Sequence, residues 1–188
     1  LRLSEQEMST VMQEFQQEMQ AKQQEQMAKR QEEMAKRQEE MQAQAEEGSK
    51  AAEEFRAENL KRDEVEETDS GLQYMVLRKG EGESPGPEDM VRVHYHGKLI
   101  NGTVFDSSVE RGEPAEFPLN RVIEGWQEAI PMMKEGARWR LFIPPDLAYG
   151  QMGSPPDIPP NSLLIFDVEL LDVLDEPAAE PQAPQAEM

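Results

Sequence analysis

Hydrophobic and polar positions follow two rhythms along this chain, and the first is helical. Within residues 4–20 the large apolar side chains recur at spacings of four, three and four, at Met8, Met12, Phe15 and Met19. This is the a/d rhythm of a helix that packs against a partner helix. We therefore expect residues 4–20 to form a dimerisation helix that makes the protein a homodimer.

Residues 24–44 continue as heptads with a single strongly apolar position in each, at Met27, Met34 and Met41. A coiled coil needs two apolar positions per heptad, so this stretch predicts an exposed helix. Several Glu–Lys and Glu–Arg pairs lie four residues apart, and each stabilises such a helix by about 0.2–0.5 kcal/mol. We expect a stalk with a soft point at Gly48 and Ser49. The alternative interpretation is a solvated helix without a function of its own, or a segment that is partly disordered.

The second rhythm is that of strands, and it follows a break in the helical pattern at residues 68–71. Val91, Val93 and Tyr95 alternate with polar residues, which is typical of a half-buried strand. Asn101-Gly102 between two apolar runs predicts a two-residue type I′ hairpin. Residues 122–130 show helical spacing, and residues 139–143 and 163–174 complete a set of antiparallel strands.

These patterns predict an α+β protein with three parts. Residues 1–68 are expected to be a helical dimerisation segment and stalk. Residues 69–174 are expected to form a curved antiparallel sheet wrapped on one short helix. Residues 175–188, rich in Ala, Pro, Glu and Gln, are predicted to be a disordered acidic tail.

Composition excludes several functional classes. The net charge of -20 leaves no basic stripe for phosphates, so we expect no nucleic-acid partner. The chain has no cysteine, which excludes disulfides and thiolate catalysis but leaves the compartment open. No apolar run approaches the roughly 20 residues of a membrane helix. His94 and His96 share a strand face, but without a third histidine or a cysteine we expect neither a metal site nor a cofactor.

Five motifs carry a family resemblance over residues 71–173. They are Val93-His94-Tyr95-His96-Gly97, Thr103-Val104-Phe105-Asp106-Ser107-Ser108, Val122-Ile123-Glu124-Gly125-Trp126, Ala148-Tyr149-Gly150 and Ile158-Pro159-Pro160-Asn161. Their order and approximate spacing resemble those of FKBP-type peptidyl-prolyl cis-trans isomerase domains. The N-terminal helix, followed by Gly71-Leu72-Gln73-Tyr74, resembles the dimerisation helix and stalk of the macrophage-infectivity-potentiator and periplasmic branch. The resemblance implies that the chain begins inside that dimerisation domain.

The resemblance implies a catalyst of Xaa-Pro bond rotation in unfolded or proline-containing client proteins, with chaperone activity and an FK506-like macrolide as a further ligand. It implies catalytic roles for Asp106, Tyr149, Trp126 and Phe105, with the Trp126 indole as the pocket floor and the Ile123 N–H as a donor. The implied substrate-binding residues are Tyr95, Phe105, Asp106, Val122, Ile123, Trp126, Tyr149, Ile158 and Phe166.

Other interpretations stay open at this point. Trp126, Phe105 and Phe166, taken singly, are more often core residues, and Asp106 could cap a turn. A proline-binding chaperone or adaptor without turnover, on a dimeric helical stalk, is the alternative function. Ala115 stands where many relatives have an aromatic residue, with Phe117 two residues on, so we expect a more open pocket rim. Ser154 occupies a loop position that is histidine in the best-known small members, and both departures bear on substrate preference and macrolide affinity. The resemblance implies a periplasmic or outer-membrane-associated protein, with the cytoplasm as the alternative.

Overall fold

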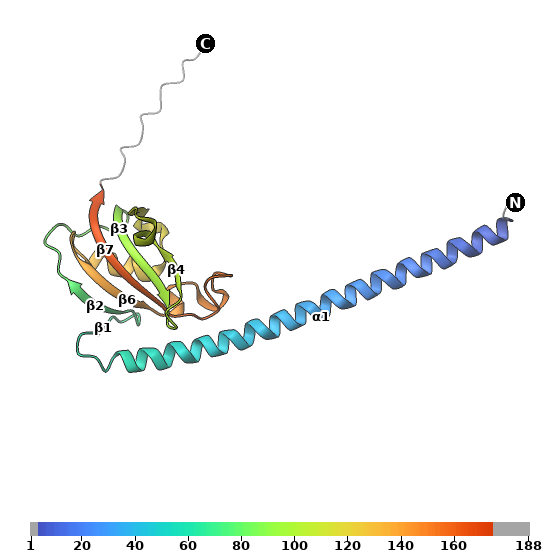
Figure 1. The fold of residues 1–188 in the computed structure, drawn as a ribbon, viewed down its shortest axis with the longest axis horizontal. Helices are drawn as coiled ribbons and strands as arrows, with labels where there is room; N and C mark the ends of the chain where they lie inside the picture. Colours follow the sequence, from blue (N-terminus) through green and yellow to red (C-terminus); the bar gives the residue numbers. More distant parts are fainter. Residues whose placement is uncertain (1–3, 175–188) are drawn as a thin grey trace, which may run out of the picture. The chain divides into compact units, whose positions relative to one another are not determined.

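The computed structural model describes residues 4–174 (Figure 1). It is an α+β protein in which a long helix, α1 (Glu5–Asn59), precedes an antiparallel sheet. The chain divides into two compact units, one ending at Ala43 and the other beginning at Gln44. The predicted tail, residues 175–188, lies outside the described residues.

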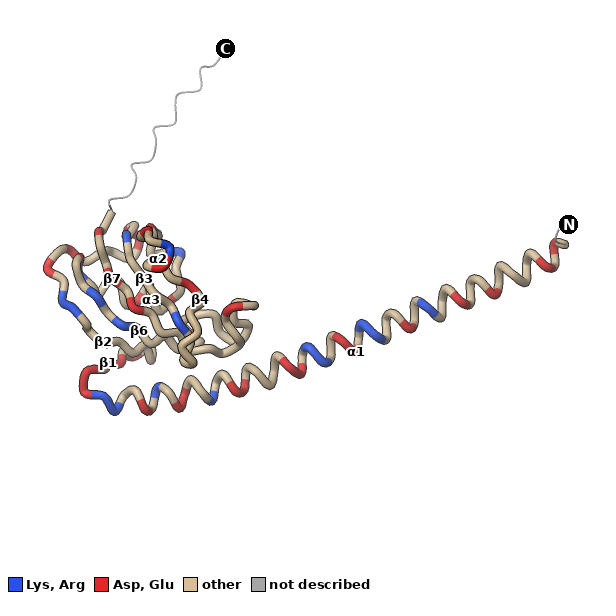
Figure 2. Tube along the Cα trace, in the orientation of Figure 1, with Lys and Arg blue, Asp and Glu red and all other residues tan. Residues whose placement is uncertain are grey.

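The first unit is helical and exposed, as the heptads predicted. Its start is a capping box, because the Ser4 N–H donates to Glu7 Oε2 over 2.8 Å and the Glu7 N–H donates to Ser4 Oγ over 3.4 Å. From Glu18 onward acidic and basic residues are interspersed along the helix (Figure 2), and within residues 4–43 four i,i+4 ion pairs join them, the first between Glu18 and Lys22. The large apolar side chains of residues 4–20 are exposed in the single chain.

In the second unit the sheet order is β1-β2-β6-β7-β3-β4, and β5 also pairs with β3. All of these pairings are antiparallel. The strands are β1 (Glu66–Glu67), β2 (Gln73–Arg78), β3 (Met90–Leu99), β4 (Val104–Ser107), β5 (Ala115–Pro118), β6 (Arg138–Ile143) and β7 (Leu164–Leu174).

Strand β3 has two neighbours on one edge, and this arrangement positions the candidate site. Its beginning pairs with β5 and its end with β4, whereas β7 pairs with its other edge along the whole length. The short helix α2 (Ser108–Arg111) lies in the chain between β4 and β5. The residues around β4 and α2 are therefore held beside the middle of β3.

Each face of the sheet carries its own hydrophobic cluster. On one face the side chains of β3, β6 and β7 pack around α3 (Glu124–Ala129). On the other face Phe142 and Ile165 pack with Ala52 and Phe55 of α1, and the Phe55 and Phe142 ring centroids are 5.8 Å apart. The end of α1 is thus a second cover for the sheet, which the sequence pattern did not predict.

The expected boundary near residues 68–71 differs from the structure. Helix α1 ends at Asn59 and β1 comes before residue 68. The physical reason is burial, because Asn59 is only 4% exposed and its Nδ2 donates to Gln73 Oε1 of β2 over 2.9 Å. The last turns of α1 therefore belong to the sheet unit. The helix also continues through Gly48 and Ser49, where we expected a soft point.

The predicted type I′ hairpin is wrong in its turn type. Such a turn needs positive φ at two residues, but Gly102 has φ +87° and Asn101 is not among the positive-φ residues. Leu99 donates its N–H to Thr103 O and accepts from the Gly102 N–H, which defines a three-residue loop. Asn101 Oδ1 accepts from the Thr103 N–H over 2.9 Å. This local hydrogen bond stabilises Asn101 in the longer loop.

Candidate functional site

A cavity of about 560 Å³ opens over the face of the sheet that α3 covers. All nine predicted substrate-binding residues line it: Tyr95, Phe105, Asp106, Val122, Ile123, Trp126, Tyr149, Ile158 and Phe166. Phe117, Arg121, Ser154 and Asp157 line it as well. Residues from β3, β4, β5, α3, β7 and the loop after β6 thus meet around one space.

The floor of this cavity is a cluster of aromatic rings centred on Trp126, which is 4% exposed. Its ring centroid lies 5.2 Å from that of Phe166 and 5.3 Å from that of Tyr95, both in edge-to-face geometry. Phe105 meets Phe166 edge-to-face at 5.4 Å. Such pairs prefer these arrangements because the ring edge is positive and the face negative. The cluster gives the cavity a rigid apolar floor.

Two glycines allow close packing around the cavity. A Cβ on Gly97 of β3 would lie 2.6 Å from Phe166 and 2.8 Å from Phe105, so only glycine leaves room for both. A Cβ on Gly125 would lie 2.6 Å from Ile143 Cγ2, which shows how closely α3 packs on β6. The motif glycines therefore act on the site through packing.

Two N–H groups at the cavity have no hydrogen-bond partner within residues 4–174. Trp126 Nε1 is buried without a hydrogen-bond partner in the described part of the chain. Ile123 is the N-cap of α3, and its carbonyl accepts from the N–H groups of Trp126 and Gln127. Its own N–H makes no hydrogen bond within residues 4–174. Ile123 lines the cavity, so its N–H is a donor that a bound carbonyl can use, whereas Trp126 Nε1 is covered by its neighbours.

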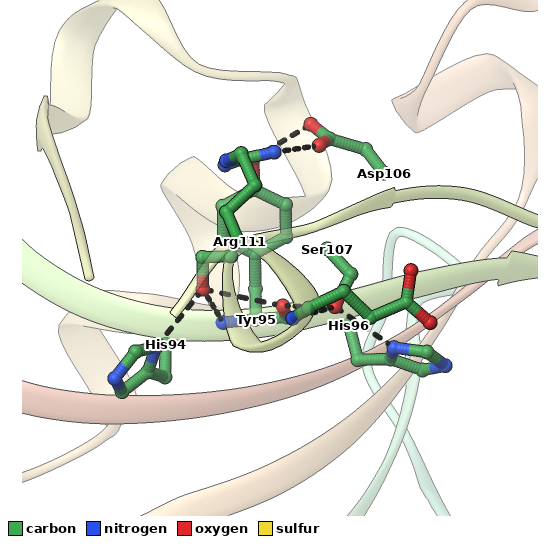
Figure 3. Close-up of polar contacts among 8 residues, drawn as sticks. His94, Tyr95, His96, Asp106, Ser107 and Arg111 are labelled. Atoms are coloured by element: carbon green, nitrogen blue, oxygen red, sulfur yellow. Dashed lines mark hydrogen bonds and ion pairs between the residues drawn. The ribbon is translucent and has the colours of Figure 1, made fainter. Parts of the chain in front are cut away.

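One carboxylate at the cavity is held from two sides. The Tyr95 hydroxyl donates to Asp106 Oδ2 over 2.6 Å, and Arg111 pairs with Asp106 Oδ1 (Figure 3). Arg111 also donates to the Tyr95 hydroxyl over 2.9 Å. Arg111 reaches this position because Ser107 caps α2, accepting from the Glu110 N–H, and Gly112 ends the helix with φ +76°.

This network sets the ionisation of its members. Partial burial raises the pKa of Asp106, but the hydrogen bonds from Tyr95 and Arg111 and the charge of Arg111 outweigh it, and the pKa lies below its ordinary value. The pKa of Tyr95 is raised, first by burial and then by its hydrogen bond to the Asp106 carboxylate. Asp106 is therefore an anion at neutral pH and Tyr95 a neutral donor.

His94 and His96 alternate with Tyr95 along β3, so they lie on the other face of this strand. There they contact Ser108 and Ser107, the two serines that follow Asp106. Ser108 Oγ accepts from the Tyr95 N–H over 2.8 Å and lies 3.1 Å from His94 Nδ1, and Ser107 Oγ lies 3.0 Å from His96 Nδ1 (Figure 3). Within residues 4–174 no group of three or more side chains is arranged to hold a metal ion. Both imidazoles are joined to the serines that follow Asp106.

Sequence reasoning missed Arg111 and did not place Phe117 in the site. Phe117 lies 5.7 Å from Trp126 and 6.0 Å from Tyr95, between ring centroids. It was visible in the sequence as the aromatic residue two positions after Ala115. Arg111 follows Asp106 by five residues, and only the α2 turn brings the two together, so the pattern gave no signal for it.

Comparisons with known proteins agree with this geometry. The family model for FKBP-type peptidyl-prolyl cis-trans isomerases matches residues 81–171, and the model for the domain amino terminal to these isomerases matches residues 27–76. The crystal structure of FkpA from Escherichia coli is 40% identical with a TM-score of 0.72, covering 94% of this chain and 76% of that one. The chain belongs to the FKBP-type peptidyl-prolyl isomerase family.

Curated members of the FKBP family show the same similarity. The FKBP-type 22 kDa isomerase of Escherichia coli is 59% identical over 117 residues, which is 62% of this chain and 57% of that protein. The isomerase Mip of Coxiella burnetii is 54% identical over 119 residues, or 63% and 52% of the two chains. The chain spans about half the length of the curated relatives it matches. In its described part, no helix is both long and apolar enough for a membrane crossing.

Proposed function

We propose that this FKBP chain catalyses the cis-trans isomerisation of Xaa-Pro bonds in proteins that are folding. The observation that carries the proposal is the cavity floored by the buried Trp126 indole and walled by apolar and aromatic side chains. A prolyl ring is apolar and compact, and it is well matched to such a floor. The family membership of the chain supports the same activity.

The chemistry needs neither a nucleophile nor a metal. Rotation about an amide bond crosses a barrier of about 18–20 kcal/mol because resonance is lost, and uncatalysed Xaa-Pro exchange takes tens to hundreds of seconds. A twisted amide has less charge separation than a planar one. An apolar pocket with fixed dipoles therefore favours the twisted state relative to the planar one. A ten-thousandfold acceleration requires only about 5–6 kcal/mol.

Each proposed catalytic residue has a role that its position supports. Trp126 and Phe105 pack against the prolyl ring, and the Ile123 N–H donates to a substrate carbonyl. Asp106 presents a fixed negative charge beside the amide, because its carboxylate is already held by Tyr95 and Arg111. Tyr149 is 41% exposed, so its hydroxyl can reach a substrate at the rim.

The test is a protease-coupled assay with a chromogenic prolyl tetrapeptide, run on the wild-type chain. Turnover that scales with enzyme concentration is the expected result. If the peptide binds, followed by Trp fluorescence, but does not turn over, the protein is the proline-binding chaperone or adaptor module named above as the alternative. An FK506-like macrolide should compete with the peptide, since in the proposal both ligands occupy the one cavity lined by these rings.

The N-terminal helix supports a further part of the proposal, a homodimer formed through residues 4–20. Met8, Met12, Phe15 and Met19 are all at least 45% exposed in the single chain, and a second copy would cover them. Two linked sites would hold one unfolded client at a higher effective concentration. Chaperone activity and a periplasmic or outer-membrane-associated location belong to this proposal as well, and they rest on the resemblance described in the sequence analysis.

A further inference from the structure

Asn161 joins the two ends of the pocket loop to helix α1. Its backbone N–H donates to Gly150 O over 2.9 Å, which closes the loop of residues 150–161. Its side-chain Nδ2 donates over 2.9 Å to Ala45 O, a carbonyl of α1. Asn161 has φ +52°, and among the described residues no other non-glycine residue has a positive φ. Asparagine tolerates this left-handed conformation better than most residues.

Helix α1 meets this loop backbone to backbone at Gly48. A Cβ on Gly48 would lie 2.4 Å from Pro160 O and 3.0 Å from Asn161 O. Real Cβ atoms do not approach backbone oxygens so closely, and these oxygens cannot turn away as the end of a side chain can. Glycine costs a helix interior about 0.5–1 kcal/mol relative to alanine. The close approach gives a physical reason for a glycine at this helical position.

The loop that α1 holds in this way carries two walls of the cavity. Tyr149 directly precedes Gly150, and Ile158 lies three residues before Asn161. Ile158 is 4% exposed and exchanges two backbone hydrogen bonds with Ser154, of 2.8 and 2.9 Å. The position of Ile158 in the cavity therefore depends on a short, tied loop whose far end rests on α1.

We propose that Asn161 and Gly48 are positioning residues for the proline pocket. In this proposal the last turns of α1 hold the loop of residues 150–161 in place, in addition to ending the stalk. This inference rests on the proposed isomerase function. Ile158 also packs in the core of the sheet unit, whereas the backbone hydrogen bonds Ser154–Ile158 and Asn161–Gly150 run within the loop itself. The bond from Asn161 to Ala45 O adds a tie to α1 at the far end of the loop. The result for the substrate is the placement of the apolar Ile158 side chain.

The first test replaces Asn161 with glycine. Asn161→Gly keeps the left-handed backbone accessible and removes the hydrogen bond to Ala45. We expect KM for a prolyl peptide to rise about fivefold to tenfold, the scale of one hydrogen bond, while kcat changes less than twofold. A displaced wall weakens binding of ground state and transition state alike. The control Ser162→Ala removes a neighbouring bond to Pro159 O that does not involve α1, and it should leave KM unchanged.

The second test approaches the contact from the helix. Gly48→Ala improves intrinsic helix propensity but places a methyl group against Pro160 O, so KM should rise by a similar factor. Gln44→Ala, an exposed helical position, improves propensity without this clash and serves as the control. In the double variant Gly48→Ala with Asn161→Gly the untied loop can move away from the methyl group. The two effects should therefore combine to less than their product.

Hydrogen exchange gives a readout that does not depend on turnover. Asn161→Gly and Gly48→Ala should each speed exchange of the Ser154, Ile158 and Asn161 amides by at least tenfold, with β6 and β7 unchanged. Unchanged KM and unchanged exchange of these amides in both variants would overturn the inference, as would a loss confined to kcat or to thermal stability. An inactive wild type would count against the proposed function instead, and the exchange rates would then decide the inference alone.

Discussion

The Tyr95 hydroxyl donates a 2.6 Å hydrogen bond to Oδ2 of Asp106, and Arg111 contacts both groups. Both carboxylate oxygens of Asp106 thus have partners. The carboxylate is held in place at the cavity and is not a free base awaiting a proton. Its proposed contribution is a fixed charge, and the residues that hold it should matter for that reason.

Asp106→Ala should lower kcat/KM for a prolyl peptide by about tenfold to a hundredfold, the range for a hydrogen bond to a charged group. Tyr95→Phe should cost about threefold to tenfold, because Arg111 still holds the carboxylate. Tyr74→Phe is the matched control, since its hydroxyl donates a similar 2.6 Å bond to Glu66 outside the cavity. A loss for Tyr74→Phe equal to that for Tyr95→Phe would contradict a specific role for the network.

The pH dependence follows from the same network. Because the pKa of Asp106 is lowered below its usual value near 3.8, the group stays ionised as the pH falls from 8 to 5. We therefore expect kcat/KM to be constant over that interval and to fall only at more acidic pH. Nuclear magnetic resonance exchange spectroscopy of a prolyl peptide measures this without a coupling protease. An inflection between pH 5 and 8 would show that another group controls the rate.

Two substitutions of Trp126 distinguish its role in the site from its role in the core. Trp126→Ala should lower the free energy of unfolding by about 3–5 kcal/mol, the usual cost for a buried tryptophan, and should abolish measurable turnover. Trp126→Phe keeps an aromatic floor and should retain most of the stability while kcat/KM falls severalfold. Urea unfolding and the peptide assay check the two quantities separately. Equal kcat/KM for Trp126→Phe and the wild type would mean that the indole is only a core residue.

Much of the site could be predicted from the sequence because the motifs contain the lining residues together with the glycines that let them pack closely. Gly97 and Gly125 are readable as motif residues, and the structure explains them as the positions where Phe105, Phe166 and Ile143 approach. The strands around Tyr95 and the helix at Trp126 follow from alternation and helical spacing. The predicted lining residues therefore meet in one cavity, whereas their individual catalytic roles stay predictions.

What could not be predicted depends on contacts between distant segments. The end of α1 looks like a continuation of the stalk, because Ala52 and Phe55 add little apolar pattern to a polar helix. Only the facing residues Phe142 and Ile165 show that this turn is buried. The contact of Gly48 with Pro160 O is likewise invisible in sequence, where a lone glycine indicates flexibility.

A second ion pair predicts how acid affects stability. Arg140 Nε donates to Asp167 Oδ1 over 2.6 Å, and Arg140 Nη2 donates to Asp167 Oδ2 over 2.9 Å. Burial raises the pKa of Asp167, but Arg140 outweighs it and the pKa is lowered. Such a group stabilises the folded state above its ordinary pKa, and this contribution is lost as the pH falls through the lowered pKa.

Asp167→Asn should therefore lower the free energy of unfolding at pH 7 by about 1–3 kcal/mol and lose less stability than the wild type on acidification to pH 3. Urea unfolding at several pH values measures both effects. Asp172→Asn is a control, because its partner Arg92 also pairs with Glu116 and Asp172 is more exposed. Parallel stability curves for Asp167→Asn and the wild type would contradict the assignment.

The apolar positions of residues 4–20 predict the oligomeric state. Phe15 is 58% exposed in the single chain, and in the proposed dimer it lies at the interface. Phe15→Glu should convert a dimer into a monomer, because two buried carboxylates would face each other without partners. Light scattering at micromolar concentration checks the mass. Turnover of a short prolyl peptide per chain should not change, since the cavity is built from residues 95–166.

Met27→Glu is the matched control, because Met27 is similarly exposed at 62% but lies beyond residues 4–20. It should remain dimeric. Refolding of a proline-limited protein client should slow for Phe15→Glu and not for Met27→Glu, because only the first variant separates the two sites. A wild type that scatters as a monomer would exclude the dimer, and a dimeric Phe15→Glu variant would place the interface elsewhere on the chain.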